Sequence, residues 1–200
     1  MDISKIAEHN RLLYIEDQAF DKTIPAEYFS TETEFENCKF LNCDLSEFNL
    51  AGLRFMDCEF NSCNLSLVQL RNTSLQDVRF NHCKMLGLHF SDCSSFGFSV
   101  SFNNCILNHT SFYKTKLKKT SFVNSQLVET DFSECDLSHA SFSNCDLTLA
   151  TFDRTNLEGA DLRTSLHYSI NPENNRIKKA KFSMTGLSGL LEKYDIVIEP

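Results

Sequence analysis

The sequence has few glycines, a deficit of positive charge and no long apolar run. Its 6 glycines are scattered, so they form no Gly-rich loop that could hold a phosphate. Lys and Arg number 19 against 27 Asp and Glu, and the net charge is -8. A nucleic-acid-binding surface needs an excess of Lys and Arg, and a membrane helix needs about 20 apolar residues. The sequence therefore predicts neither direct binding to nucleic acid nor insertion into a membrane.

The N-terminal stretch MDISKIAEHNRLLYIEDQ interrupts its apolar residues with acids and has no continuous apolar core. A secretory signal needs such a core. We therefore expect a cytoplasmic protein.

Large apolar residues recur at every fifth position over most of the chain. Five residues turn a helix by about 500°, so successive side chains would not share a face, and in a straight strand an odd step alternates between the two faces. The chain must therefore turn once per repeat around an apolar axis, which predicts a solenoid. The centre positions are Phe35, Phe40, Leu45, Leu50, Phe55, Phe60, Leu65, Leu70, Leu75, Phe80, Met85, Phe90, and then Phe102, Leu107, Phe112, Leu117, Phe122, Leu127, Phe132, Leu137, Phe142, Leu147, Phe152, Leu157 and Leu162.

Small residues stand two positions before the centres, where a chain that turns every five residues also points inward. All 9 cysteines follow this phase. Free Cys packs as a small apolar residue, so the cysteines are interpreted as reduced core fillers. They contain no CxxC pair, so no zinc site, other metal site or cofactor is expected.

A tandem motif of a small residue, Asp or Asn, then Leu or Phe followed by two further residues covers about 35 to 165. This motif resembles the pentapeptide-repeat family. The resemblance implies an all-β fold, a right-handed quadrilateral β-helix with four repeats per coil, in which residues 20 apart stack on one face.

Other segments narrow the resemblance. The stretches CNLSLVQLRNTSLQDVRFNHCKMLGLHF and CILNHTSFYKTKLKKTSF resemble Qnr quinolone-resistance proteins and, more closely, the albicidin immunity protein. INPENNRI is similar to a segment of the microcin B17 immunity protein, and FSMTGLSGLLEKYDIVIEP resembles the dimerisation module of Qnr-type rods. These resemblances imply a homodimer that binds DNA gyrase or topoisomerase IV by DNA mimicry and protects it from quinolones or a peptide-like poison.

The expected organisation has five parts. An N-terminal segment and irregular first coil (1–34) precede a first repeat block (35–93), a loop (94–101), a second block whose last coil is irregular (102–182) and a C-terminal capping and dimerisation module (183–200).

The loop SSFGFSVS shifts the phase of the repeat by two residues. Phe96, Gly97 and Phe98 have two interpretations, an inward bulge that preserves the core or an outward contact with a partner. The contact is favoured because Qnr-type proteins have functional loops at the corresponding place.

Acidic residues crowd the later coils, close to the expected dimer junction. Carboxylates on a narrow rod could imitate the phosphates of duplex DNA, or could simply keep the rod soluble. The mimicry interpretation assigns the docking surface to Asp131, Glu134, Asp136, Asp146, Asp153, Glu158 and Asp161.

The C-terminal tail has helical spacing followed by a β-branched run, which predicts a short helix and a strand. Such a module could only cap the open end of the solenoid, but its apolar surface exceeds what a cap needs. The expected dimer interface is Leu187, Leu190, Leu191, Tyr194, Ile196, Val197 and Ile198.

No catalytic constellation is present in the sequence, so an enzyme is not expected and no catalytic residue is assigned. The alternative function is a scaffold or regulatory rod whose protein partner is unrelated to topoisomerase.

Overall fold

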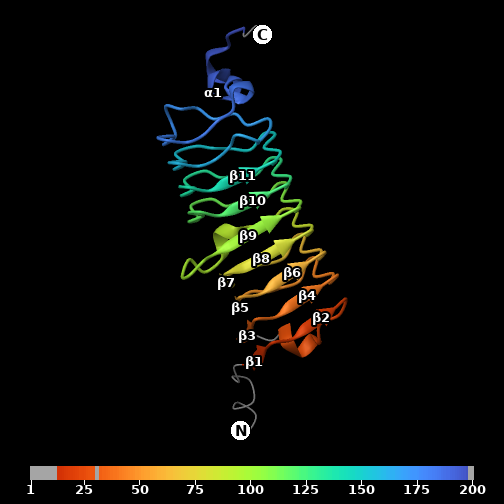
Figure 1. The fold of residues 1–200 in the computed structure, drawn as a ribbon. Coiled ribbons are helices and arrows are strands. Elements are labelled where there is room, and N and C mark those ends of the chain that lie inside the picture. The colour runs from red at the N-terminus through yellow and green to blue at the C-terminus, as the bar shows by residue number, and fades with distance from the viewer. Residues whose placement is uncertain (1–12, 30–31, 198–200) are drawn as a thin grey trace, which may run out of the picture.

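The computed structural model describes residues 13–29 and 32–197 as a rod that winds from its N-terminal to its C-terminal end (Figure 1). Short parallel strands stack along the rod, and the helix α1 (Ser188–Leu191) lies at its C-terminal end. This architecture confirms the predicted quadrilateral β-helix.

The strands form two parallel sheets on adjacent sides of the coils. One has the order β1-β3-β5-β7 and the other β11-β10-β9-β8-β6-β4-β2. Their bounds are β1 Leu13–Glu16, β2 Ala19–Asp21, β3 Thr33–Glu36, β4 Lys39–Leu41, β5 Arg54–Met56, β6 Glu59–Asn61, β7 Ser74–Gln76, β8 Val78–Asn81, β9 Val100–Asn103, β10 Ser121–Val123 and β11 Ser141–Ser143. The other sides are joined by isolated parallel bridges such as Asp44 to Asn64. Pairing between coils satisfies the backbone groups that the narrow rod buries.

The register between coils is 20 residues, as in the pairing of Phe40 with Phe60. Between β8 and β9 it becomes 22, because Phe80 pairs with Phe102. The phase shift of two residues read from the sequence is thus an insertion of two residues into one coil.

Most turns of the chain use a residue with positive φ, two positions after a centre. Examples are Asn104, Glu129 and Asn144, with φ of 54°, 54° and 54°. The left-handed conformation bends the chain between neighbouring sides of the coil, and Asn and Asp adopt it more readily than other side chains except Gly. Because the bend recurs every five residues, the centre side chains all face the axis.

The axis is filled by phenylalanines from successive coils. Phe112 and Phe132 stack with ring centroids 5.3 Å apart, and Phe122 contacts Phe132 edge-on at 5.9 Å. All three side chains are fully buried. Stacked pairs within columns and edge-on pairs between columns are both favourable ring geometries.

The cysteines are free thiols, and eight of the nine are buried, Cys93 being intermediate. Their Sγ atoms donate to carbonyls of the preceding coil, as Cys63 does to the Phe40 oxygen at 3.3 Å. Burial raises the pKa of Cys58 and that of Cys135 to about 12. These thiols act as core fillers, as the sequence predicted.

The N-terminal coil is more regular than expected. Leu13 pairs with Thr33 and Phe20 with Phe40, so β1 and β2 already follow the 20-residue register. Irregular structure is confined to the other half of this coil, which includes the 3-10 helix η2 (Ala26–Phe29). The regular register therefore already includes Leu13, within the part expected to be irregular.

The C-terminal segment consists of the 3-10 helix η4 (Met184–Gly186), α1 and the 3-10 helix η5 (Glu192–Tyr194). Asp195 then turns the chain with a φ of 50°. The strand expected after the helix is not formed at Ile196 and Val197, because no neighbouring strand pairs with them. Ile198, the last member of the expected strand and interface, lies outside the described residues.

Candidate interaction surfaces

The inserted loop, residues 94–99, projects from the rod because only its two ends are hydrogen-bonded to the backbone of the preceding coil. Ser94 N donates to the Thr73 oxygen at 2.9 Å, and Ser99 N donates to the Leu75 oxygen at 3.0 Å. The stretch from 94 to 99 thus lies opposite the shorter stretch from 73 to 75 of the preceding coil. The surplus length is displaced outward at residues 95–97, all of which are exposed.

The two phenylalanines of the loop have different environments. Phe96 is 80% exposed, whereas Phe98 is partly buried and contacts Phe90 edge-on with centroids 6.3 Å apart. Gly97 lies between them with a φ of 66°, close to the side chain of Gln76. Phe98 therefore packs against the core, as the inward interpretation expects, while Phe96 is exposed and its contact with a partner stays a prediction.

The acidic residues of the expected DNA-mimic surface lie on all four sides of the rod. Their bridges place Asp131 beside Ser111, Asp136 beside Lys116, Asp146 beside Gln126 and Asp161 beside Ser141. Within a coil of 20 residues, these four acids are offset from one another by 5, 10 or 15 residues. Each step of five residues leads to another side of the coil. The structure therefore does not bring these carboxylates together into one stripe.

Most of these carboxylates are paired with a basic group. Glu134 lies 3.0 Å from Arg154 and 3.5 Å from Lys114, and Asp161 lies 2.7 Å from Arg163. Further pairs join Asp146 to His167, Asp153 to Arg154 and Glu158 to Arg176. Asp131 and Asp136 instead accept hydrogen bonds, from the backbone N–H groups of Ser133 and Ser138. Many of these ion pairs join neighbouring coils, so they help to hold the coils in register. They also reduce the negative potential that the acids produce at the surface.

These contacts lower the pKa of three carboxyls, those of Asp136, Asp146 and Asp161. The Arg163 guanidinium beside Asp161 lowers the pKa of Asp161 to about 2. Desolvation opposes the shift at Asp146, but hydrogen bonds from Thr148 and His167 leave its pKa below the ordinary value. All three groups are therefore ionised at neutral pH.

A more continuous acidic surface lies at the N-terminal end, where the sequence analysis assigned none. Asp17, Asp57 and Asp77 occupy one corner column, separated by 20-residue steps, and all are exposed. None of the three forms an ion pair within the described residues; Asp17 accepts a hydrogen bond from Asn37 at 2.6 Å. The signal was present in the sequence, because the three acids share the position two after a centre.

Two groups of basic residues border the acids of the second block. Lys114, Lys116, Lys118 and Lys119 precede these acids in the chain, and Arg176, Lys178, Lys179 and Lys181 follow them. The last coil before the C-terminal segment is thus rich in positive charge. In the second block, coils rich in basic residues therefore lie before and after the coils that carry these acids, and the charge alternates along the rod.

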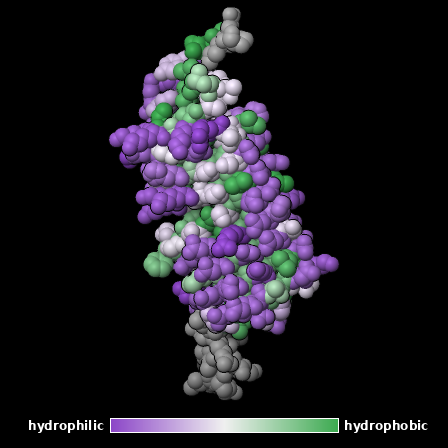
Figure 2. Space-filling view, viewed as in Figure 1, coloured by the Kyte–Doolittle hydropathy of each residue, from purple (hydrophilic) through white to green (hydrophobic). Residues whose placement is uncertain are grey.

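Apolar side chains are exposed at the C-terminal end. Figure 2 shows a mostly hydrophilic visible face and a concentration of apolar side chains near this end. The exposed residues are Met184 at 85%, Leu187 at 37%, Leu191 at 37%, Tyr194 at 52%, Ile196 at 55% and Val197 at 88%. Leu190 instead packs partly buried against the core. Most described members of the expected dimer interface therefore share one end of the rod.

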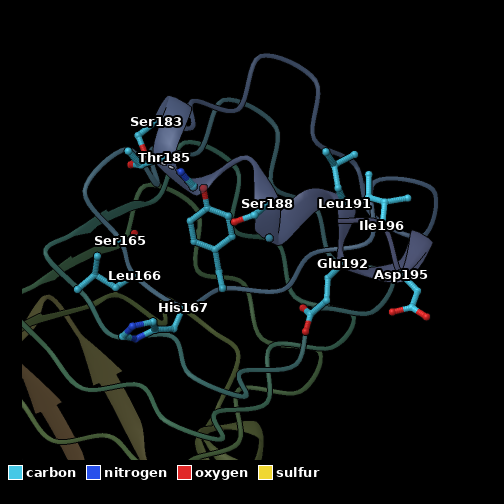
Figure 3. Close-up of a pocket in the computed structure, with 13 residues that line it drawn as sticks. Ser165, Leu166, His167, Ser183, Thr185, Ser188, Leu191, Glu192, Asp195 and Ile196 are labelled. Atoms are coloured by element: carbon cyan, nitrogen blue, oxygen red, sulfur yellow. Dashed lines mark hydrogen bonds between the residues drawn. The ribbon is translucent and has the colours of Figure 1, made fainter. Parts of the chain in front are cut away.

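A recess of about 670 Å³ separates the C-terminal segment from the last coil (Figure 3). Leu166 and His167 line it on the coil side, and Leu191, Glu192 and Ile196 on the other. Among the described residues that line the recess, no hydroxyl is hydrogen-bonded to a side chain that could act as a base. His167 instead pairs with Asp146 on the coil. The recess is a surface feature between the cap and the last coil.

The C-terminal segment is fixed to the last coil around Tyr168. Ile170 N donates to the Gly189 oxygen at 2.9 Å, and a Cβ on Gly189 would lie 2.1 Å from the Tyr168 backbone oxygen. Glu173 binds both the Lys193 ammonium and the Tyr194 hydroxyl. The cap is therefore held by close backbone approach as well as by polar contacts.

Within residues 13–29 and 32–197, no group of His, Cys, Asp and Glu has a metal-binding arrangement. Over the same part of the chain, no helix is long and apolar enough to span a membrane.

The comparisons with known proteins agree with this architecture. The family model described as "Pentapeptide repeat region" matches residues 33–96 and 98–182. The chain belongs to the pentapeptide-repeat family. No curated protein sequence matches it.

Two solved structures of QnrB1, described as a plasmid-mediated fluoroquinolone resistance protein, have similar folds. A trypsin-treated form is 22% identical with a TM-score of 0.60, and the alignment covers 94% of this chain and 98% of that one. The full-length form is also 22% identical with a TM-score of 0.60, covering 92% and 98%. At this identity the likeness establishes the shared fold.

Proposed function

We propose that this rod is a non-enzymatic binding protein whose partner is a type II topoisomerase, DNA gyrase above all, with topoisomerase IV as a related target. Binding protects the enzyme from a quinolone or a peptide-like poison. The observation that carries the proposal is the rod itself, with one projecting loop and a C-terminal cap, matching almost the whole length of QnrB1. Fold likeness alone does not specify a partner, so the surfaces described above must supply the contacts.

The proposed mechanism uses the narrow shape and the carboxylates of the rod. Duplex DNA presents about one negative charge per 1.7 Å of its axis. The acidic band from Asp131 to Asp161 and the column of Asp17, Asp57 and Asp77 would dock on the positive DNA-binding surface of the enzyme. The loop containing Phe96 then contacts the enzyme and promotes loss of the poison from the cleavage complex.

The proposed assembly is a homodimer joined at the C-terminal ends. Leu187, Leu191 and Tyr194 are exposed together with Ile196 and Val197, and a closed two-fold contact would remove this apolar surface from water. End-to-end pairing doubles the length of the rod, which suits an extended DNA-binding surface.

Supercoiling by purified gyrase tests the proposal. We expect addition of the protein to restore supercoiling in the presence of at least one of ciprofloxacin, albicidin and microcin B17. A variant with Leu191→Asp tests whether the dimer is needed, and Leu67→Asp is its control because Leu67 is exposed in the first block, several coils before the cap. Absence of rescue with all three poisons at every protein concentration would overturn the protection proposal.

The alternation of basic and acidic coils in the second block favours a second candidate, a scaffold with an unrelated protein partner. Several acids of the second block are neutralised by neighbouring bases, as Glu134 is by Lys114 and Arg154. A scaffold needs local patches rather than one continuous negative face. Pull-down of gyrase subunits from a cell extract, with and without drug, separates the candidates: recovery of gyrase supports the first, and recovery of another protein without gyrase supports the second.

A further inference from the structure

The projecting loop lies next to the first basic group of the second block. Before the loop, Phe90 N donates to the Ser111 oxygen; after it, Phe102 pairs with Phe122. The chain from 112 to 121 is therefore the neighbouring coil on the C-terminal side of the loop. That stretch contains Lys114, Lys116, Lys118 and Lys119.

Three of these lysines are free to meet a partner. Lys114 is 3.5 Å from Glu134 and 4.7 Å from the centre of the Tyr113 ring. In contrast, Lys116, Lys118 and Lys119 are exposed and form no ion pair within 4 Å of any carboxylate in the described residues. Carboxylates lie nearby without pairing: Asp77 lines the same hollow as Lys119 and accepts a hydrogen bond from the Ser99 hydroxyl at 2.8 Å, and Asp136 lies beside Lys116 on the next coil.

We propose that Phe96 together with Lys116, Lys118 and Lys119 forms one docking surface for an acidic region of a protein partner that offers an apolar recess. A side chain that is 80% exposed on a loop with fixed ends can be buried by a partner at little conformational cost. Unpaired lysines beside it attract carboxylates and repel a basic surface. On the proposed topoisomerase, this loop would therefore contact an acidic region, whereas the acidic surfaces of the rod contact the DNA-binding region.

Aromatic and basic side chains together are also typical of single-stranded nucleic-acid binding. The net charge of -8 disfavours that occupant, because a polyanion would be repelled by the rest of the rod. An acidic protein region that contacts only this surface avoids most of that repulsion.

The chain contains a matched control for the lysines. Lys178 and Lys179 lie 60 residues after Lys118 and Lys119, which places them on the same two columns about 14 Å further along the rod. They too are exposed and form no ion pair in the described part of the chain. Reversing either pair changes the net charge equally, so only position differs.

The first experiment measures the dissociation constant for purified gyrase and therefore rests on the proposed function. We expect Lys118→Glu with Lys119→Glu, and separately Phe96→Ala, to weaken binding by about ten-fold or more. Lys178→Glu with Lys179→Glu should change it by less than about two-fold. Equal effects of the two double variants, or no effect of Lys118→Glu with Lys119→Glu, would overturn the docking surface while leaving gyrase binding intact.

The second experiment does not need gyrase. Amide NMR of the full chain is followed during titration with poly-glutamate and, separately, with an oligothymidylate at the same salt concentration. Shifts from poly-glutamate concentrated at Phe96, Lys118 and Lys119 support the surface, and equal shifts at Lys178 and Lys179 overturn it. Tighter binding of oligothymidylate at the loop would overturn the protein partner in favour of a nucleic acid. If gyrase fails to bind in the first experiment, the proposed function falls and this titration alone judges the surface.

Discussion

Phe122 and Phe142 lie on successive coils with their rings stacked, centroids 4.9 Å apart and planes at 4°. Both are fully buried. The same column continues at Leu162, also fully buried. One inward position thus accepts either a phenyl ring or a leucine side chain, which explains how Phe and Leu share the centre of the repeat.

Removal of this ring should destabilise the rod strongly. We expect Phe122→Ala to lower the free energy of unfolding by about 3–5 kcal/mol, because it removes buried apolar surface and leaves a cavity. Phe122→Leu should cost less than about 1.5 kcal/mol, since leucine is already accommodated in this column. Guanidinium denaturation followed by circular dichroism measures both. Similar losses for the two variants would show that the column requires aromatic stacking.

Leu149 is a stabilisation target. It is 71% exposed and has a φ of 57°, a left-handed conformation that a leucine adopts at a cost. We expect Leu149→Asn to raise the free energy of unfolding by about 0.5–1 kcal/mol, because Asn tolerates this conformation better. Thermal and chemical denaturation measure the gain. Lys178→Asn, an exposed position without positive φ, should give no comparable increase; an equal increase would remove backbone conformation as the cause.

Gly189 should control attachment of the C-terminal segment. Gly189→Ala would place a methyl group 2.1 Å from the Tyr168 oxygen, so the segment must shift away from the last coil. We expect faster amide exchange and proteolysis within 183–197, with the coils before Tyr168 unchanged. Gly52→Ala is the control: nothing lies within 4 Å of its added Cβ, and its own backbone strain, from a φ of 78°, arises in the first block and not at the C-terminal segment. Equal protection of 183–197 in wild type and Gly189→Ala would contradict the close packing.

The stability of the rod should depend on the ionisation of Asp161, because this carboxylate forms an ion pair with Arg163. The pKa of Asp161 is lowered to about 2, so its contribution to stability is complete above the unfolded value near 3.8 and is lost as the pH falls toward 2. We expect Arg163→Gln to raise the pKa of this carboxyl, measured by NMR titration of the side chain. Arg71→Gln is the control because Arg71 does not contact Asp161. An unchanged titration in Arg163→Gln would exclude the ion pair as the cause.

Leu191 should control the oligomeric state. We expect the wild type to sediment as a dimer at micromolar concentration and Leu191→Asp to sediment as a monomer, because a buried unpaired carboxylate opposes association. Leu67→Asp introduces the same charge at an exposed position of the first block and should remain dimeric. A monomeric wild type in analytical ultracentrifugation would overturn the end-to-end interface.

Local regularity explains which features were predictable. The centres, the small inward residues and the insertion before Val100 were all visible, because each repeat meets the same steric constraint. The start of the solenoid was missed: Ile15 and Phe20 follow the phase, but Pro25 and Ser30 occupy the next centre positions and hide the continuity. The expected strand at Ile196 failed for another reason, because β-structure needs a neighbouring strand that no local pattern can supply.

The five-residue spacing alone requires the chain to wind around a core of Phe, Leu and small side chains, since no helix or straight strand can bury that pattern. Which outward residues become neighbours depends instead on how successive coils stack. A step of five residues moves a side chain to another side of the rod, whereas a step of 20, or 22 across the loop, brings two side chains together. The acids from Asp131 to Asp161 are for this reason distributed over the four sides and mostly paired, whereas the loop with Phe96 and the stretch with Lys118 lie on neighbouring coils.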